Sequence, residues 1–322
     1  MEFTFLGTSA GVPTLQRNVS GLVIKQANSK SWCLVDCGEG TQHQLLRLPH
    51  SLVQLDTILI THVHGDHCFG LPGLLATASM AGRKQALTIV APHGVEEFVR
   101  ATFTFTDVSL SYPLNFVLSD ALGVYVEAKG FSITSVILSH RVASYAYRFE
   151  EVPSCPNLDS KKLIAYGVPP GEAWGQLIKN GQIELNDGQQ LRLQDYVLPQ
   201  RPSRAVIVGG DNDTPDLIHT AARGAQVLIH EATYSQEVGQ KVGPWPQHST
   251  AASVAESAQR MDIKNLVLTH FSARYHHHDQ SRRMSIGELK REAQQHYRGN
   301  LFLANDFDKY VLNLEGDLYL SD

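Results

Sequence analysis

The segment THVHGDH, residues 61–67, constrains this chain more than any other stretch of its sequence. It follows the apolar run DTILI, which predicts a β-strand leading into a loop. Four side chains able to bind a metal ion therefore lie within six residues: His62, His64, Asp66 and His67. His62 and His64 alternate along the strand end and would reach one ion, while the following turn would direct Asp66 and His67 to a second. The motif predicts a metal site at a strand end.

Three further residues of metal-binding type end predicted strands later in the chain. SITSVILS precedes His140, RAVIVGG precedes Asp211, and NLVLT precedes His270. Residues at the carboxyl ends of sheet strands sit on rigid supports around one crevice. A single histidine in such a place is most often a structural residue, but the shared position of all seven residues favours ligation. Seven ligands suffice for two ions if Asp211 bridges them.

The remaining pattern predicts an α/β protein. Short runs rich in β-branched residues recur from end to end, and helix candidates lie between them at residues 215–223, 250–261 and 285–297. The length of 322 residues suits one large α/β domain that carries an insertion. Pro and Gly are dense between about 148 and 196, so this segment is expected to form a protruding arm, with helical turns at 160–166 and 171–179.

Composition excludes several classes of protein. Hydrophobic residues make up 43% and charged residues 18%, enough apolar material for a core. No apolar run is long enough to span a membrane, and the N-terminal stretch MEFTFLGTSAGVP does not resemble a secretory signal, so a cytoplasmic location is expected. Four irregularly spaced cysteines, Cys33, Cys37, Cys68 and Cys155, are expected to be reduced thiols.

The charge balance of 27 basic against 32 acidic residues argues against binding nucleic acid over the whole surface. A local basic patch follows His270, formed by Arg274, Arg282, Arg283, Lys290 and Arg291. Such a face is usually plain solvated surface, but its closeness to the predicted metal site favours phosphate contact by Arg274. The triplet at 276–278 is expected to be an exposed loop rather than a third metal site.

The chain resembles the ribonuclease Z family of the metallo-β-lactamase superfamily along nearly its whole length. The matching segments are FLGTSAGVPTLQRN at 5–18, DCGEGTQHQL at 36–45, THVHGDH at 61–67, HEAT at 230–233, HST at 248–250 and ANDF at 304–307. Two segments depart from the family pattern. GGDN at 209–212 stands where members often have GDT, and the arm reads VPSCPNLD and GVPPGEAW instead of a KPG-containing sequence followed by GVPPGP.

The resemblance implies a metallo-β-lactamase αββα four-layer sandwich as a single domain over residues 1–322, with residues 148–196 as a tRNA-binding arm. It implies two zinc ions per subunit, one held by His62, His64, His140 and Asp211, and the other by Asp66, His67, Asp211 and His270. Asp66 would also be the catalytic acid/base residue, and His248, supported by Glu231, would lie near the scissile phosphate. A homodimer without a membrane partner is expected.

The implied activity is a zinc-dependent endoribonuclease that removes the 3′ trailer from precursor tRNA. Metal-activated water would attack the phosphodiester with Asp66 as base, and His248 would protonate the departing ribose 3′ oxygen. The products would be a 3′-OH on the tRNA and a 5′-phosphate on the trailer. Two alternatives remain: a phosphodiester or thioester hydrolase of the same fold, and a non-catalytic RNA-binding relative.

Overall fold

The structure of the chain is a computed structural model, which describes residues 1–321 apart from 122–125, 153–155, 186, 200–201 and 277–283. It consists of two compact units, one formed by Met1–Glu151 with Arg204–Asp322 and the other by Val152–Ser203. Among the described residues, every helix is too short or too polar to cross a membrane.

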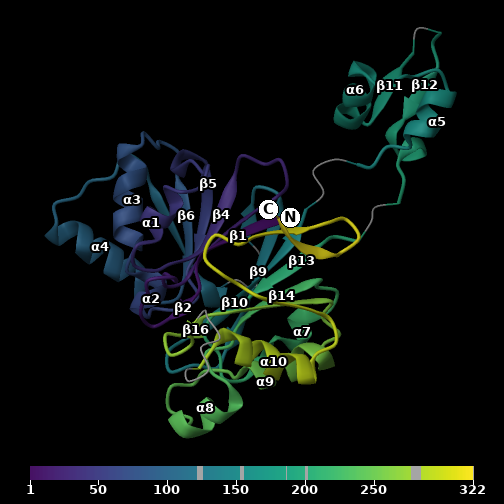
Figure 1. Ribbon diagram of the computed structural model, residues 1–322. Helices are drawn as coiled ribbons and strands as arrows, with labels where there is room; N and C mark the ends of the chain where they lie inside the picture. Colours follow the sequence, from purple (N-terminus) through teal and green to yellow (C-terminus); the bar gives the residue numbers. More distant parts are fainter. Residues whose placement is uncertain (122–125, 153–155, 186, 200–201, 277–283, 322) are drawn as a thin grey trace. The chain divides into compact units, whose positions relative to one another are not determined.

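Two mixed sheets form the centre of the larger unit (Figure 1). The spatial order of the first is β19 (Leu318–Ser321), β18 (Lys309–Leu312), β1 (Glu2–Gly7), β3 (Gly21–Lys25), β4 (Trp32–Cys37), β5 (Leu55–Leu59), β6 (Leu87–Ala91) and β7 (Leu114–Leu118). The order of the second is β17 (Asn300–Leu303), β15 (Asn265–Thr269), β14 (Val227–Glu231), β13 (Ala205–Val208), β10 (Ser144–Glu151), β9 (Phe131–Leu138) and β8 (Val126–Ala128). Short β2 (Ser9–Ala10) and β16 (Phe271–Ser272) pair separately.

Helices cover the outer face of each sheet. Those beside the first sheet are α1 (Thr41–Leu45), α2 (Gly65–Cys68), α3 (Leu71–Met80) and α4 (Val95–Phe105), with the 3₁₀ turns η1 (Leu52–Gln54) and η2 (Ser119–Ala121) nearby in the chain. Those beside the second are η4 (Pro215–Ile218), α7 (His219–Ala222), α8 (Gln236–Val242), α9 (Ala251–Arg260) and α10 (Ile286–His296). The order of layers is therefore helix, sheet, sheet, helix.

Alternation along the strands explains this layering. In β13, Val206 and Val208 point into the core between the two sheets, whereas Ala205 and Ile207 point outward to the core beneath α9 and α10. All four side chains are buried, because each face of the strand is covered. The predicted four-layer α/β architecture is thus present.

The helix predictions agree with the structure except in one local detail. Residues 250–261 and 285–297 contain α9 and α10, and the hydroxyl of Thr250 caps α9 by accepting from the amide of Ser253. Residues 215–223 instead begin as the 3₁₀ turn η4 before α7. The hydroxyl of Thr214 accepts no capping hydrogen bond from this turn and donates to Asp213 at 2.7 Å.

The smaller unit has its own hydrophobic core. It contains α5 (Ser160–Ala165), α6 (Glu172–Asn180), the hairpin of β11 (Gln182–Glu184) and β12 (Gln190–Arg192), and η3 (Leu193–Tyr196). Their buried side chains are Leu163, Val168, Leu177, Leu191 and Tyr196. The expected start of the arm at residue 148 lies inside β10, which continues to Glu151 because Glu150 pairs with Ala205 of β13.

Candidate metal centre

Strand ends from both sheets meet at one site. β5 leads to His62 and His64, and α2 then supplies Asp66 and His67. β9 leads to His140, β13 to Asp211 and β15 to His270. β13, β14 and β15 are parallel, and β9 runs the same way because it and β13 are both antiparallel to β10. All seven predicted ligands are therefore brought to one edge of the sandwich.

The first group of ligand atoms surrounds a single point. Nδ1 of His64 lies 3.1 Å from Nε2 of His62 and 3.2 Å from Nε2 of His140. Oδ2 of Asp211 lies 3.6 Å from Nε2 of His62 and 3.8 Å from Nε2 of His140. Four atoms at the corners of a tetrahedron around a Zn²⁺ ion would be about 3.4 Å apart. The spacing matches that of a four-coordinate metal site.

The second group lies beside the first. Nε2 of His270 lies 3.3 Å from both Nε2 of His67 and Oδ2 of Asp66. Oδ1 of Asp211 lies 3.5 Å from Nε2 of His67 and 3.4 Å from Nε2 of His270. Asp211 thus directs one carboxylate oxygen to each group, and this is the geometry of a bridging ligand.

Hydrogen bonds hold two of the histidine rings so that a nitrogen lone pair of each points toward the two groups of ligand atoms. Nδ1 of His140 donates to the carbonyl of Gln247 at 2.9 Å, and Nδ1 of His67 donates to Oδ2 of Asp36 at 2.7 Å. When one ring nitrogen of a neutral imidazole carries the proton, the other presents a lone pair. Each Nε2 that faces the site can then act as a metal ligand, with its ring held in place by a hydrogen bond on the opposite side.

Hydroxyl groups orient the rings of His62 and His270, whose Nε2 atoms also face the site. Oγ1 of Thr61 lies 3.1 Å from Nδ1 of His62 and donates to Asp36, while Oγ1 of Thr233 lies 3.1 Å from Nδ1 of His270 and donates to Glu231. Each hydroxyl therefore accepts a hydrogen bond from a ring N–H and donates one to a carboxylate. Four imidazoles oriented in this way, together with the carboxylates, fit divalent ions such as zinc.

Electrostatics also favours cations at the site. Burial lowers the pKa of His62 and of His140, which keeps these rings neutral. Burial would lower the pKa of His67 as well, but the carboxylates of Asp66, Asp36 and Asp211 raise it well above the ordinary value. The second group thus lies in a strongly negative environment, in which a divalent ion would offset the carboxylate charges.

Asp66 is held in place by the glycine-containing loop near the N-terminus. The amide of Gly11 donates to its Oδ2 at 2.8 Å. Gly11 has a φ of 71°, a left-handed conformation that glycine adopts without strain. At Gly38 a Cβ would lie only 2.2 Å from the carbonyl oxygen of Asp66. The GTSAG and DCGEG segments therefore provide close backbone packing around Asp66.

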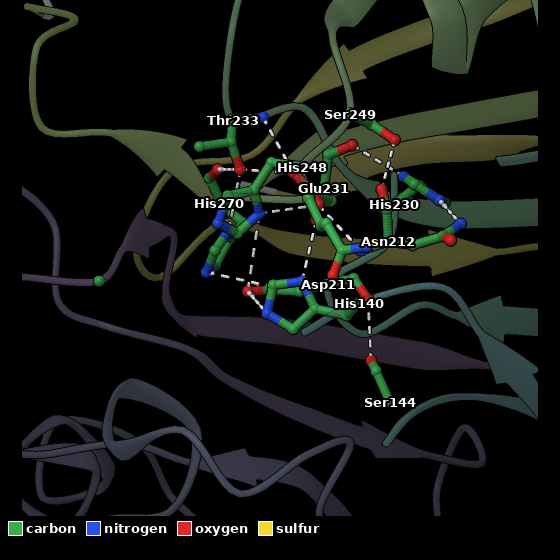
Figure 2. Close-up of polar contacts among 12 residues, drawn as sticks. His140, Ser144, Asp211, Asn212, His230, Glu231, Thr233, His248, Ser249 and His270 are labelled. Carbon is green, nitrogen blue, oxygen red and sulfur yellow. Dashed lines mark hydrogen bonds and ion pairs between the residues drawn. The ribbon is translucent and has the colours of Figure 1, made fainter. Parts of the chain in front are cut away.

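His248 and Glu231 form an ion pair beside the two groups (Figure 2). Nδ1 of His248 lies 3.0 Å from Oε1 of Glu231 and 3.7 Å from Oδ2 of Asp211. Burial opposes protonation of His248, yet the charges of Glu231 and Asp211 raise its pKa to about 9. Burial likewise opposes ionisation of Glu231, but His248 lowers the pKa of this carboxyl to about 2. The pair supplies an imidazolium next to the predicted metal site.

Several residues of this network were absent from the sequence-based prediction. Asp36, at the end of β4, adopts a φ of 59°, and its only sequence signal is the DCGEG motif. Asn212 stands where the family often has threonine; its Oδ1 accepts from the amide of Ser139 at 3.2 Å and its Nδ2 lies 3.0 Å from Nε2 of His230. Asn212 thereby joins the loop after β9 to β14.

The basic patch is described only in part. Arg274 is exposed, with its Cζ 5.6 Å from the centroid of the Tyr234 ring, and that ring lies 5.9 Å from the ring of His248. Lys290 and Arg291 are exposed on α10, whereas Arg282 and Arg283 lie outside the described residues. His276 is exposed, and His277 and His278 lie outside the described residues.

The structure describes three of the four cysteines. Cys33, Cys37 and Cys68 are buried free thiols, and Cys155 is not described.

Comparison with known proteins shows that the chain has relatives that match it over its full length. The chain is 52% identical over 322 residues to a ribonuclease Z of Marinobacter nauticus, covering 100% of this chain and 99% of the relative. It is similar to the crystal structure of the short form of human tRNase Z, with a TM-score of 0.67, 25% identity, and coverage of 98% of this chain and 100% of that one.

Two other matches are more limited. A metallo-β-lactamase fold protein of Bacillus subtilis, YhfI, has a TM-score of 0.64 at 18% identity, covering 96% of this chain and 98% of that one, a likeness of fold alone. A family profile described as anti-Pycsar protein Apyc1 matches residues 1–102 only. That match covers β1 to β6 and most of α4, and it includes the THVHGDH motif.

Proposed function

The chain belongs to the ribonuclease Z family and is therefore a metal-dependent endoribonuclease of the metallo-β-lactamase fold. We propose that it binds two zinc ions and removes the 3′ trailer from precursor tRNA. The observation that carries this proposal is the position of Asp211, with one oxygen 3.6 Å from His62 and the other 3.5 Å from His67. One carboxylate serves both ligand groups, as expected for a two-metal phosphodiesterase.

In the proposed site, His62, His64, His140 and Asp211 hold one ion, and Asp66, His67, Asp211 and His270 hold the other. Bound together, such cations activate water as a nucleophile and offset negative charge on a phosphate. Asp66, held by the amide of Gly11, would accept the proton of the attacking water. The exposed guanidinium of Arg274 would contact a phosphate of the RNA.

His248 is proposed as the acid that protonates the departing 3′ oxygen. Its Nδ1 is engaged by Glu231, so Nε2 is the nitrogen left for proton transfer. The charge of Glu231 keeps the ring protonated near neutral pH, as a general acid requires. Proton donation to that oxygen leaves a 3′-OH on the tRNA and a 5′-phosphate on the trailer.

The smaller unit, residues 152–203, is proposed to bind the body of the tRNA. It is inserted between two paired strands and has a core of its own, so it can present a surface without contributing to the metal site. The resemblance to the family further suggests a homodimer, which sedimentation of the purified protein would detect.

A cleavage assay with mapped product ends tests the proposal. Purified protein would be incubated with a 3′-extended precursor tRNA, with and without chelator, and its zinc content measured. The expected result is about two zinc ions per chain and chelator-sensitive cleavage that leaves a 3′-OH on the tRNA. Hydrolysis of a small phosphodiester without precursor cleavage would instead indicate a general phosphodiesterase, and RNA binding without cleavage a non-catalytic protein.

A further inference from the structure

A tight turn next to the metal centre presents an exposed tryptophan. Trp245 has 74% of its surface exposed, whereas Trp32 is 1% exposed and Trp174 is tied to the carbonyl of Val168 by its indole N–H. A large aromatic side chain is usually buried when it has only a packing role. The exposure of Trp245 beside a catalytic centre is therefore a feature that needs a reason.

The position of Trp245 is well determined by backbone contacts. The amide of Gln247 donates to the carbonyl of Pro244 at 3.1 Å, which places Trp245 at the corner of a turn between two prolines. The carbonyl of Gln247 accepts from Nδ1 of His140 at 2.9 Å. The turn is thus tied to a predicted metal ligand, and the backbone of Trp245 is held at a defined place beside the site.

An arginine accompanies the ring. Cζ of Arg141 lies 4.5 Å from the centroid of the Trp245 ring, close enough for a cation–π contact. Arg141 directly follows His140 and is exposed. An arginine stacked in this way keeps its N–H donors free for phosphate oxygens while the indole offers an aromatic surface.

These side chains border an open depression of about 750 Å³, lined by His64, Arg141, Val142, Pro244, Trp245 and Gln247. A second depression of about 530 Å³ lies across the same turn and includes Tyr234 and His248, and both share Pro244 and Gln247. The turn that carries Trp245 is therefore a ridge between two hollows beside the ligands His64 and His140.

We propose that Trp245, with Arg141, is a stacking platform for one unpaired base adjoining the scissile phosphate. Sites for single-stranded RNA combine aromatic rings, on which bases stack, with arginines that follow the backbone. The platform would hold the strand across the metal centre, and this role rests on the ribonuclease function proposed above. The base belongs to the nucleotide on the 5′ or the 3′ side of the cleaved bond.

Substrates that lack one base show whether the stacked base belongs to the 5′ or the 3′ nucleotide. Precursor tRNA would be prepared with an abasic nucleotide immediately 5′ or immediately 3′ of the cleavage site. We expect Trp245→Ala to lower kcat/KM about 5- to 150-fold on the intact precursor, the range that loss of one stacked base produces. On the abasic substrate whose missing base normally stacks, the same substitution should have little further effect.

Conservative and distant variants serve as controls. Trp245→Phe should retain most of the activity, because phenylalanine also stacks. Phe105→Ala removes another exposed aromatic residue, 88% exposed at the end of α4 and outside the site, and should leave kcat/KM unchanged. Zinc content should be the same in all of these variants.

A fluorescence titration detects the binding of RNA at Trp245 in the absence of cleavage. With chelator present, a short single-stranded RNA should quench the fluorescence of the full-length protein, and Trp245→Phe but not Trp174→Phe should abolish the quenching. If the protein quenches in this way but cleaves no precursor, the proposed function fails and the platform stands. Unchanged kcat/KM in Trp245→Ala, or an equal loss on every substrate, would overturn the platform. A change in the molecular mass of the assembly in Trp245→Ala would also overturn it, because it would mark Trp245 as part of an interface between chains.

Discussion

Nδ1 of His248 lies 3.0 Å from Oε1 of Glu231, although 17 residues separate the two along the chain. Glu231 is the last residue of β14, while His248 lies just before α9, whose N-cap is Thr250. The buried carboxylate orients the imidazole and keeps it protonated. Several expected outcomes depend on this contact and on others like it.

Removing the charge of Glu231 should change the pH dependence of cleavage. The pKa of His248 is raised to about 9, so its acidic form is present at neutral pH and is lost as pH rises through that value. Glu231→Gln removes the raising charge and should move the alkaline limb of the kcat profile to lower pH. His248→Gln should lack this limb and lower kcat by about 10²- to 10⁴-fold. Superimposable profiles for wild type and Glu231→Gln would show that Glu231 does not set the pKa of the acid, and retention of the alkaline limb in His248→Gln would exclude His248 as the acid.

Substitution of Asp211 should cost metal as well as activity. Its two oxygens face both ligand groups, so Asp211→Ala should reduce the zinc content below two ions per chain and abolish cleavage. Zinc would be measured by elemental analysis of the dialysed protein. Asp213→Asn, two residues away, is the matched control and should keep its zinc. A full zinc complement in Asp211→Ala would refute the bridging role.

Asp36 should tune zinc affinity without contacting the ion. It accepts the Nδ1 proton of His67 at 2.7 Å and the amide proton of Thr61 at 2.8 Å. Loss of such a supporting carboxylate typically weakens metal binding about 10- to 100-fold. Asp36→Asn should show this loss in a competition titration against a chromogenic chelator. Glu39→Gln, an exposed change in the same DCGEG segment, should behave as wild type.

Deleting the smaller unit should separate RNA recognition from chemistry. Glu151 and Arg204 are joined by a backbone hydrogen bond of 2.9 Å, so a short turn can replace residues 152–203 without disturbing β10 or β13. The shortened protein should bind zinc and hydrolyse a small phosphodiester at the wild-type rate. Its KM for precursor tRNA should rise steeply, and an unchanged KM would mean that the unit has no part in RNA binding.

Local patterns in the chain specify which strands and helices form and which metal-binding residues follow the strands. The strands before His62, Asp211 and His270 are recognisable because burial on both faces requires short apolar runs, whereas the strand before His140 is half-buried and shows alternation instead. Helices α9 and α10 follow equally local patterns. These properties depend on residues adjacent in the chain, so no knowledge of the packing is needed to see them.

The pairing of these residues with one another depends on how distant parts of the chain pack. The contact of Asp36 with His67 spans 31 positions, and that of His140 with Gln247 spans 107. Which oxygen of Asp211 faces which ligand group, and the meeting of Arg141 with Trp245, likewise depend on how the two sheets pack and how the loops cross. Such contacts arise from the register and stacking of distant strands, and these are set by the whole core rather than by any local pattern.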